Sequence, residues 1–341
     1  MPIKRVQQAI EDIKHGKMVV MIDDEDRENE GDLVYAATFS TPEKVNFMAT
    51  EAKGLICVAI SKAIAERLQL EPMVQNNDSQ HETAFTVSVD AKEATTGISA
   101  FERDMTIKLL ADPVSSPDDF VRPGHIFPLI AKEGGVLVRT GHTEGSVDLC
   151  RLSGVAPSAV ICEIMREDGQ MARRDDLELF AKKHGLNIVY ISDIVEYRLR
   201  NERLVRAMEE EEIDFFGTKA VKKRFVDHQG KEHFAVIFYR LHETENVKFH
   251  NIGPDVDLLL NQHRYSQLIG SIEYLKKNGG VIIFLDSRDS AGDTMKEYGI
   301  GAQILAELGI RNIKLLVSSK GREFVGLGGF GLDIAEEIEI R

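Results

Sequence analysis

The sequence is poor in cysteine and contains no tryptophan. Its 341 residues include three cysteines, Cys57, Cys150 and Cys162, and no two of them have zinc-finger spacing. An odd number of dispersed cysteines is typical of free thiols in a reducing compartment, so we expect a cytoplasmic protein. No cysteine follows residue 162, which leaves the second half of the chain without a thiolate ligand for zinc.

Long hydrophobic runs and an excess of basic residues are also absent. No apolar stretch approaches the ~20 residues that a membrane-spanning helix needs, and the N-terminal segment has no hydrophobic signal sequence. The net charge is −14, which argues against general binding to nucleic acid or to anionic membranes. The length and the 43% hydrophobic content allow two domains with their own cores.

Negative charge is concentrated in residues 23–32, Asp-Asp-Glu-Asp-Arg-Glu-Asn-Glu-Gly-Asp, where seven of ten positions are acidic. Apolar runs at 18–22 and 33–37 flank the segment, which predicts a loop between two strands. Crowded carboxylates repel one another, and a hard divalent cation relieves that repulsion. Arg27 within the segment can pair with a phosphate or with a neighbouring acid. From these residues alone, a solvated surface loop is an equally good interpretation.

Alternating strand and helix patterns predict a layered α/β or α+β domain over residues 1–200. We expect helices at 2–16, 41–52 and 173–184, helices that follow Ser61 and Ser99, and one that leads from 139–146 to Leu152. Strands are expected at 18–22, 33–37, 55–60, 85–89, 136–138, 159–165 and 188–191. Residues 71–83 and 113–124 are predicted to be loops, the first of them mobile.

A charged joining segment at 193–203 predicts the start of a second α/β domain, residues 204–341. The turn sequence Asp-His-Gln-Gly at 227–230 lies between strand-like runs at 215–226 and 232–241, which predicts a β-hairpin. Helices at 263–278 and 296–308 then alternate with strands at 281–285 and 313–317. The glycine-rich run at 326–331 lacks the spacing of a dinucleotide fingerprint, so we expect a tight turn there.

Residues suited to chemistry accompany the acidic segment. His125 and His142 are each expected at a glycine-flanked turn, and Arg139 and Thr143 lie near a predicted helix start that can bind phosphate. Glu163 lies in an apolar strand, where a buried carboxylate usually has a partner or a function. Such a set suits a phosphorylated sugar chelated to Mg²⁺ or Mn²⁺, because oxygen ligands favour these ions over Zn²⁺. The metal would polarise a carbonyl while carboxylates and a histidine move protons.

Five segments, in order along the chain, resemble 3,4-dihydroxy-2-butanone 4-phosphate synthase. They are residues 23–32, Gly-Leu-Ile-Cys at 54–57, Thr-Thr-Gly-Ile-Ser-Ala at 95–100, Arg-Pro-Gly-His-Ile-Phe-Pro-Leu at 122–129 and Arg-Thr-Gly-His-Thr-Glu at 139–144. The resemblance covers about residues 1–200. It implies a cytoplasmic, homodimeric lyase of riboflavin biosynthesis that converts D-ribulose 5-phosphate to formate and L-3,4-dihydroxy-2-butanone 4-phosphate.

The same resemblance implies roles for individual residues. Glu28 and His142 would bind Mg²⁺. His125 and Glu163 would be essential to catalysis. Substrate contacts would come from the acidic segment, from the start of the helix and from the strand carboxylate: Arg27, Glu28, Asp32, Arg139, Thr140, Gly141, His142, Thr143 and Glu163, with Arg139 and Thr143 best suited to the phosphate. The implied mechanism is enolisation, loss of water, a skeletal shift and release of C4 as formate.

The second domain resembles GTP cyclohydrolase II in Lys-Glu-Tyr-Gly-Ile-Gly-Ala-Gln-Ile-Leu at 296–305 and in Gly-Leu-Gly-Gly-Phe-Gly-Leu at 326–332. That family needs a zinc site built from three cysteines, and this domain has none. The family's Arg-Gln-Glu-Gly-Arg-Gly segment is replaced in this domain by Asp-Ser-Arg-Asp-Ser-Ala-Gly at 286–292. The family's Thr-Asn-Asn-Pro segment is replaced by Val-Ser-Ser-Lys-Gly at 317–321. We hypothesise that the domain keeps the fold, binds no zinc and has lost the activity.

Two alternatives for the second domain remain open. The chain could be bifunctional and hydrolyse GTP through an unrecognised metal site, for which His242, His250 and His263 are the candidates, although their spacing matches no known ligand set. The domain could instead be a non-catalytic module that binds a nucleotide or another protein.

Overall fold

The computed structural model describes residues 2–25, 27–81, 83–239, 241–242, 244–286, 294–318 and 332–340. The chain divides into two compact units, Met1–Tyr197 and Arg198–Arg341. The boundary lies within helix α7 (Ile191–Asn201), so the predicted joining segment at 193–203 is largely helical. In the described part of the chain, no helix is long and apolar enough to cross a membrane.

The first unit is built on a seven-stranded mixed sheet with the order β4-β5-β3-β6-β2-β1-β7. Its strands are β1 (Val19–Ile22), β2 (Gly31–Ala36), β3 (Cys57–Ile60), β4 (Val89–Ala91), β5 (Phe120–Ile130), β6 (Ser158–Glu163) and β7 (Asn187–Tyr190). The central strands β2, β6 and β3 are antiparallel neighbours. Strands that are far apart in the sequence of the first unit therefore meet in the middle of one sheet.

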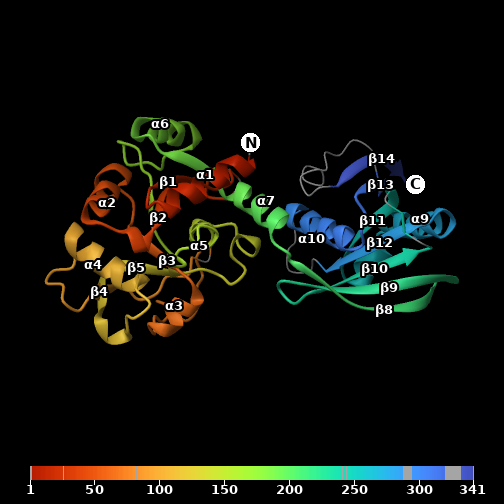
Figure 1. Cartoon of the computed structure of the whole chain (residues 1–341), viewed down its shortest axis with the longest axis horizontal. Helices are drawn as coiled ribbons and strands as arrows, with labels where there is room; N and C mark the ends of the chain where they lie inside the picture. Colours follow the sequence, from red (N-terminus) through yellow and green to blue (C-terminus); the bar gives the residue numbers. More distant parts are fainter. Residues whose placement is uncertain are drawn as a thin grey trace. The chain divides into compact units, whose positions relative to one another are not determined.

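Helices cover both faces of this sheet (Figure 1). Helices α1 (Pro2–Lys14) and α5 (His142–Leu152) pack together over β1 and β2. The other face carries α2 (Pro42–Phe47), α3 (Lys62–Arg67), α4 (Ala100–Ala111) and α6 (Arg174–His184). Strand side chains such as Val20, Ile22 and Leu33 are buried between the sheet and this second set of helices. Burial of this kind is expected when a strand is covered on both faces. The predicted α/β class is confirmed.

Three predicted helix starts are confirmed by their capping hydrogen bonds. The side chains of Thr41, Ser61 and Ser99 accept hydrogen bonds from the backbone N–H three residues further on. The predicted helix at 41–52 consists of α2 followed by a π-helical turn, Met48–Ala52. Residues 71–83 form no helix or strand in their described part, as predicted.

Three predictions for the first unit differ from the structure. The expected strand at 136–138 is a 3-10 helix, Gly135–Leu137, because Gly134 and Gly135 adopt positive φ and the N–H of Val136 is bound by the Asp148 carboxylate. The expected loop at 113–124 ends early, because β5 begins at Phe120. The predicted strand at 85–89 is reduced to isolated bridges, and β4 begins only at Val89.

The second unit has its own seven-stranded sheet, with the order β14-β13-β11-β12-β10-β9-β8. The strands are β8 (Val205–Phe215), β9 (Thr218–Asp227), β10 (Glu232–Phe238), β11 (Thr244–Ile252), β12 (Gly280–Asp286), β13 (Asn312–Val317) and β14 (Asp333–Glu339). Helix α9 (Gln262–Asn278) packs Ile272 and Leu275 on one face, whereas α10 (Thr294–Glu307) brings Gly301 close to Phe249 of β11. Helix α8 (Asp255–Leu260) precedes α9.

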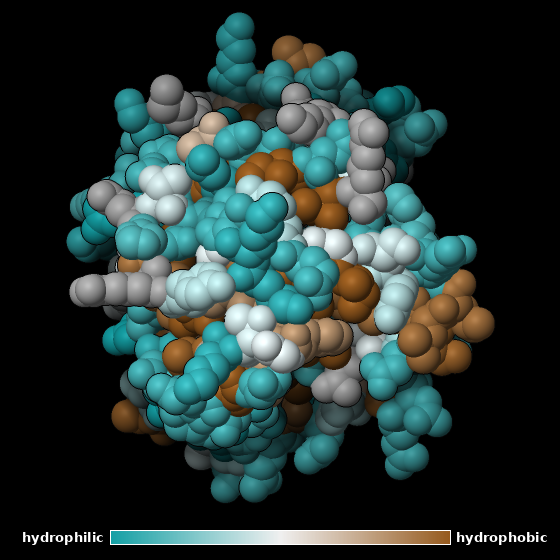
Figure 2. All heavy atoms as spheres, turned by 90° about the vertical axis from the view of Figure 1, so that its right-hand side faces the viewer, coloured by the Kyte–Doolittle hydropathy of each residue, from teal (hydrophilic) through white to brown (hydrophobic). Residues whose placement is uncertain are grey.

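The face of the molecule in Figure 2 is mostly hydrophilic, with hydrophobic residues in small separate patches.

The predicted hairpin is confirmed as β9 and β10, but the strand expected at 215–226 is divided by a turn at Phe216 and Gly217. Strand β8 was not predicted, because a run of four glutamates is typical of a solvent-exposed segment without regular structure. In the structure they face basic residues of β9, with ion pairs from Glu210 to Lys223 and from Glu211 to Lys222. The glycine-rich run at 326–331 lies outside the described residues.

One carboxylate organises the turn that precedes α4. The two oxygens of Glu102 accept hydrogen bonds from the backbone N–H groups of Thr95, Thr96 and Gly97 and from the hydroxyl groups of Thr95, Thr96 and Ser99. The hydrogen bonds from Thr95, followed by those from the other donors, lower the pKa of the Glu102 carboxyl to about 2.

We expect Glu102→Gln to destabilise the first unit in a pH-dependent way. Because the pKa of Glu102 is depressed in the folded state, its contribution is fully present above the ordinary value of 4.5 and is lost as the pH falls toward about 2. Urea unfolding between pH 7 and pH 2 should therefore show a difference between wild type and variant that shrinks below about pH 4.5. Glu178→Gln, on the exposed surface of α6, is the control. A difference that does not change with pH would contradict the assignment.

Candidate active site

Residues 23–25 and 27–30 of the acidic segment form a loop between the antiparallel strands β1 and β2, and Gly31 and Asp32 are the first residues of β2. Asp23 holds this loop in shape from the inside. Its Oδ1 accepts a hydrogen bond from the N–H of Glu30 at 2.9 Å, and its Oδ2 accepts from the N–H of Glu28 at 3.1 Å and from Nη1 of Arg27 at 2.8 Å. One buried acid thereby fixes the positions of the acids that follow it.

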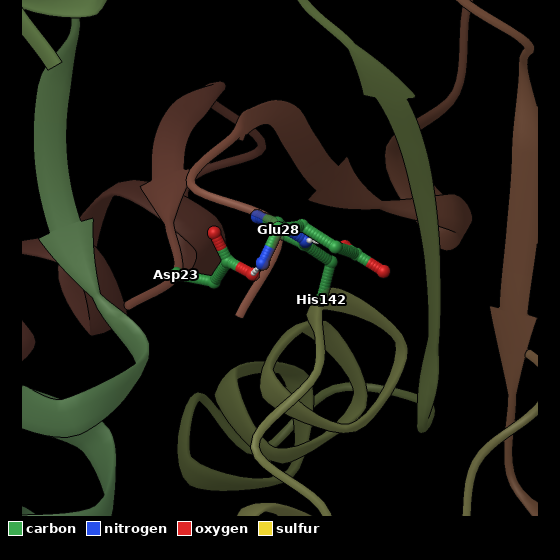
Figure 3. Close-up of side chains that lie close together, drawn as sticks. All are labelled: Asp23, Glu28 and His142. Atoms are coloured by element: carbon green, nitrogen blue, oxygen red, sulfur yellow. Dashed lines mark hydrogen bonds and ion pairs between the residues drawn. The ribbon is translucent and has the colours of Figure 1, made fainter. Parts of the chain in front are cut away.

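The side chain of Glu28 meets His142, the first residue of α5 (Figure 3). Glu28 Oε2 lies 3.6 Å from Nδ1 of His142 and 2.8 Å from Nη1 of Arg27. One ligand atom from each of Asp23, Glu28 and His142 lies within 4.8 Å of the other two. Asp23 already accepts three hydrogen bonds, which leaves Glu28 and His142 with more free capacity for a ligand than Asp23.

Two buried polar atoms without a hydrogen-bond partner indicate that a ligand binds between the acidic loop and α5. Nε2 of His142 and Oδ1 of Asp32 lie 4.0 Å apart, and neither has a hydrogen-bond partner among the described residues. A buried polar atom without a partner costs about 1–3 kcal/mol. Carboxylate oxygens and one imidazole nitrogen form a donor set that suits Mg²⁺ or Mn²⁺, so the residues fit a divalent cation.

Burial and neighbouring charges shift the pKa values of these groups in opposite directions. Burial would raise the pKa of Glu28, but the hydrogen bond with His142 and the charge of Arg27 lower it to about 2. Burial would lower the pKa of His142, but the negative charges of Asp32 and Glu28 raise it to about 9. Burial raises the pKa of Asp32 to about 7, with repulsion from Glu163 and Glu28 added to it. At neutral pH the pocket therefore contains an ion pair beside a carboxyl group close to its pKa.

Glu163 is the last residue of β6 and lies opposite Asp32 in the antiparallel pair of β6 and β2. Its Oε2 accepts a hydrogen bond from the N–H of Leu55 at 2.8 Å. The sequence placed this residue inside a strand, whereas the structure places it at the strand end, half-buried and next to the acidic loop. The two carboxylates thus share one end of the sheet.

Arg139 is held rigidly beside the start of α5. Its Nη1 donates to Oε2 of the buried Glu144 at 2.6 Å, and its Nη2 donates to the carbonyl oxygen of His81 at 2.9 Å. The other carboxylate oxygen of Glu144 accepts from the N–H of Lys132. A single guanidinium therefore connects the helix start to the loop at 71–83.

A cavity of about 160 Å³ brings most of the predicted residues together. It is lined by Arg27, Glu28, Glu30, Asp32, Cys57, Thr83, Phe85, Leu129, Arg139, His142, Thr143, Ile161 and Glu163. A wider hollow of about 800 Å³, lined largely by residues 71–85, shares Glu28, Thr83 and Phe85 with it. Thr140 and Gly141 lie next to this lining in the chain without belonging to it.

His125 is not among the residues that line this cavity. It belongs to β5 and not to a turn before a strand, as we had expected. Its side chain is 45% exposed, and Nδ1 lies 2.7 Å from Oδ2 of Asp90. The structure therefore separates one predicted catalytic residue from the pocket of the same chain.

Sequence reasoning missed Asp90 and Glu144, the acids that hold His125 and Arg139. Asp90 directly follows the alternating apolar run at 85–89, and Glu144 directly follows Thr143. Glu163 was singled out because it lies inside a predicted apolar strand, whereas Asp90 comes one position after the predicted strand at 85–89. Extending that search by one residue beyond the strand would have found Asp90.

Residues 7–197 match the family model of 3,4-dihydroxy-2-butanone 4-phosphate synthase, which is more than half of the chain. The chain belongs to this family. A 3,4-dihydroxy-2-butanone 4-phosphate synthase of Sulfurospirillum multivorans is 64% identical over 99% of this chain and 95% of its own length. The riboflavin biosynthesis protein RibBA of Bacillus subtilis is 43% identical over 98% of this chain and 93% of its own length.

Solved structures of the synthase family resemble this fold. The crystal structure of RibBX, a two domain 3,4-dihydroxy-2-butanone 4-phosphate synthase from A. baumannii, is 39% identical and covers 99% of this chain, as well as 100% of its own, with a TM-score of 0.84. A synthase structure in complex with two magnesium ions is 41% identical and covers 58% of this chain and 97% of its own, with a TM-score of 0.56.

The second unit also has a family match. Residues 287–339 match the model of GTP cyclohydrolase II, so the resemblance of the second domain to that family is confirmed. Much of the matched segment, including 287–293 and 319–331, lies outside the described residues.

We expect Gly141→Ala to disrupt the start of α5 in this synthase. A Cβ atom at Gly141 would lie 2.2 Å from Nη1 of Arg139 and 3.0 Å from Oε2 of Glu144, so the ion pair has to separate. A buried carboxylate that loses its partner should lower the free energy of unfolding by about 1–3 kcal/mol. Urea denaturation measures this change. Gly253→Ala, where a Cβ meets nothing within 4 Å, is the matched control. Equal midpoints for the two variants would contradict the prediction.

Proposed function

We propose that the first unit converts D-ribulose 5-phosphate to L-3,4-dihydroxy-2-butanone 4-phosphate and formate in riboflavin biosynthesis. The observation that carries this proposal is the single pocket in which Glu28, His142, Asp32 and Glu163 meet the start of α5. The reaction splits a five-carbon phosphate into a four-carbon phosphate and formate, so its atoms balance without a further reactant. We therefore assign the enzyme as a carbon–carbon lyase.

Glu28 and His142 are the residues that would hold a Mg²⁺ or Mn²⁺ ion. Their ligand atoms lie 3.6 Å apart, and the unpartnered Nε2 of His142 and Oδ1 of Asp32 support a ligand between the loop and the helix. When bound, the cation polarises the substrate carbonyl and makes the neighbouring C–H more acidic. Cys57, which is buried, is the one cysteine among the described residues that line the cavity. A donor set with so few thiolates does not favour zinc.

The substrate phosphate would bind at the start of α5. The first backbone N–H groups of a helix attract anions, and Thr140, Gly141 and Thr143 lie at this helix start. Arg139 is already fixed there by Glu144, so it loses little side-chain freedom when it binds a phosphate oxygen. Arg27 and Asp32, which also line the cavity, would contact the sugar hydroxyl groups.

Carboxylates at the end of the sheet would move the protons. Glu163 and Asp32 lie opposite each other on paired strands, and both line the cavity. Glu163 is oriented by the N–H of Leu55, which leaves its other oxygen to accept a proton from the substrate. Enolisation, loss of water, the skeletal shift and the return of a water molecule each need such a transfer before C4 leaves as formate.

The metal requirement gives a direct test. We expect the purified chain to release formate from D-ribulose 5-phosphate with Mg²⁺ and to lose this activity in EDTA. Glu28→Gln removes a charged ligand and should lower kcat by ~10²-fold or more. Glu25→Gln, in the same loop but 61% exposed and paired with Arg174, is the control. Formate release that survives both EDTA and Glu28→Gln would refute the assigned metal site.

We propose that the second unit does not hydrolyse GTP. It contains no cysteine and therefore cannot build a cysteine zinc site. The same formate assay with GTP as substrate tests this statement, and formate from GTP would instead favour the bifunctional alternative. Calorimetry with GTP separates a nucleotide-binding module from a purely structural unit. All three cysteines are buried free thiols, which suits the cytoplasmic location that we propose.

We also propose a homodimer in which His125 serves the pocket of the other subunit. His125 is exposed and does not line the cavity of its own chain. Ile98, Phe101 and Met105 expose apolar surface beside the turn that packs against His125, as a subunit interface would. A twofold axis would make the two exchanged contacts identical.

Complementation between two inactive variants tests the shared site. Glu28→Gln and His125→Gln should each be inactive alone. After the two are mixed and allowed to exchange subunits, each mixed dimer has one intact site, so activity should return to about a quarter of wild type. The control is the same mixture without exchange, measured directly after combination. If activity stays absent although mixed dimers have formed, His125 acts in its own chain.

A further inference from the structure

His125 is clamped by a single carboxylate. Oδ2 of Asp90 lies 2.7 Å from Nδ1 of the His125 ring, and Oδ1 of Asp90 accepts the backbone N–H of the same residue at 2.8 Å. The Asp90 side chain is only 9% exposed, whereas the ring is 45% exposed. Two contacts from one rigid, buried group fix both the backbone and the ring of His125.

The clamp lies at an irregularity in the sheet. Val89 of β4 pairs with Ile126 of β5, but Asp90 pairs with Val121, so residues 122–125 bulge out between two paired positions. The bulge needs partners for its N–H groups, and two side chains of the preceding segment supply them: Ser88 for Gly124 and Asp90 for His125. A purely structural account would end here, with Asp90 serving the backbone alone.

The ring contact goes beyond what the backbone needs. An ionised carboxylate next to Nδ1 favours the tautomer that carries its proton on Nδ1, because that proton is donated to Oδ2. Nε2 is then the basic nitrogen, and on a ring that is 45% exposed no hydrogen bond to it is found among the described residues.

A third segment, the turn that contains Gly97, packs against the contact between Asp90 and His125. A Cβ atom at Gly97 would lie 2.0 Å from Oδ2 of Asp90 and 2.6 Å from Nδ1 of His125, so only a residue without a side chain fits there. Gly97 adopts φ +77° and belongs to the turn that Glu102 holds in place. Gly97 therefore packs directly against the contact between Asp90 and Nδ1 of His125.

We propose that Asp90 is a positioning residue that sets the tautomer and orientation of His125, so that Nε2 of His125 exchanges protons with the substrate. This inference rests on the proposed function, because it assumes that His125 takes part in the lyase reaction. Asp90 itself touches neither the pocket nor the reacting atoms. It acts through the imidazole, in whichever subunit that imidazole does its work.

Asp90→Asn separates the two possible roles of Asp90. The amide oxygen of asparagine can still accept the N–H of His125, so the bulge keeps its backbone hydrogen bond. The amide NH₂ then faces Nδ1, which favours the proton on Nε2 and removes the base. We expect kcat for formate release to fall by ~10²-fold or more, with KM for D-ribulose 5-phosphate nearly unchanged. Ser88→Ala is the matched control, because it removes only the bond to Gly124.

A second measurement does not depend on activity. In protein labelled with [¹⁵N]histidine, the His125 ring signals are assigned by their loss in His125→Gln. At a pH where the ring is neutral, we expect Nδ1 to be the protonated nitrogen in wild type and in Ser88→Ala, and Nε2 to be protonated in Asp90→Asn.

The outcomes distinguish this inference from the proposed function. If wild type releases no formate from D-ribulose 5-phosphate, the proposed function fails, whatever the tautomer. If wild type is active but Asp90→Asn keeps its kcat or its Nδ1-protonated ring, the positioning role is refuted. An equal loss of activity in Asp90→Asn and Ser88→Ala, with the tautomer unchanged, would show that Asp90 supports only the bulge.

Discussion

Repulsion among carboxylates is the constraint around which the first unit is arranged. Glu28, Glu30, Asp32 and Glu163 converge at one end of the sheet, and burial raises the pKa of Asp32 to about 7. Such a concentration of charge persists only where cations or hydrogen-bond donors offset it. His142, whose nearby acids raise its pKa to about 9, supplies part of that compensation, and Arg27 supplies another part. The remaining unpartnered atoms are where a divalent cation and a phosphosugar would bind.

Acids that never face the pocket do much of the positioning. Asp23 shapes the loop through three hydrogen bonds, Glu144 fixes Arg139, and Asp90 fixes His125. Each is a buried carboxylate beside a group expected to act on the substrate. This division explains how so acidic a chain can keep a few charged groups in defined places: buried acids hold the basic side chains, and the basic side chains restrain the pocket.

The core of the second unit does not depend on a metal site. Its sheet is held by apolar packing around Phe238, Ile272 and Leu275 and by ion pairs between β8 and β9, none of which requires a metal ligand. A zinc-dependent activity, by contrast, depends on a few cysteines and is lost as soon as they are replaced. The core of the second unit therefore needs no cysteine, which supports our proposal that this unit does not hydrolyse GTP.

Local chemistry decided what could be predicted from the sequence by itself. The helix caps at Thr41, Ser61 and Ser99, the acidic loop between two strands and the α/β class depend on neighbours in the chain, and all of them are found in the structure. Family membership was also readable, because five ordered segments carry it. Glu28 and His142 could be named as partners only through that resemblance, since 114 positions separate them in the numbering.

Tertiary structure decided the contacts between distant segments. Pairing of β2 with β6 places Asp32 opposite Glu163, and the irregular pairing of β4 with β5 places Asp90 against His125. The short strand expected at 136–138 became a 3-10 helix because a distant carboxylate, Asp148, binds the N–H of Val136. The glutamate run of β8 became a strand because basic residues of β9 lie across from it. In each case the deciding partner comes from another part of the chain, so no local pattern could contain it.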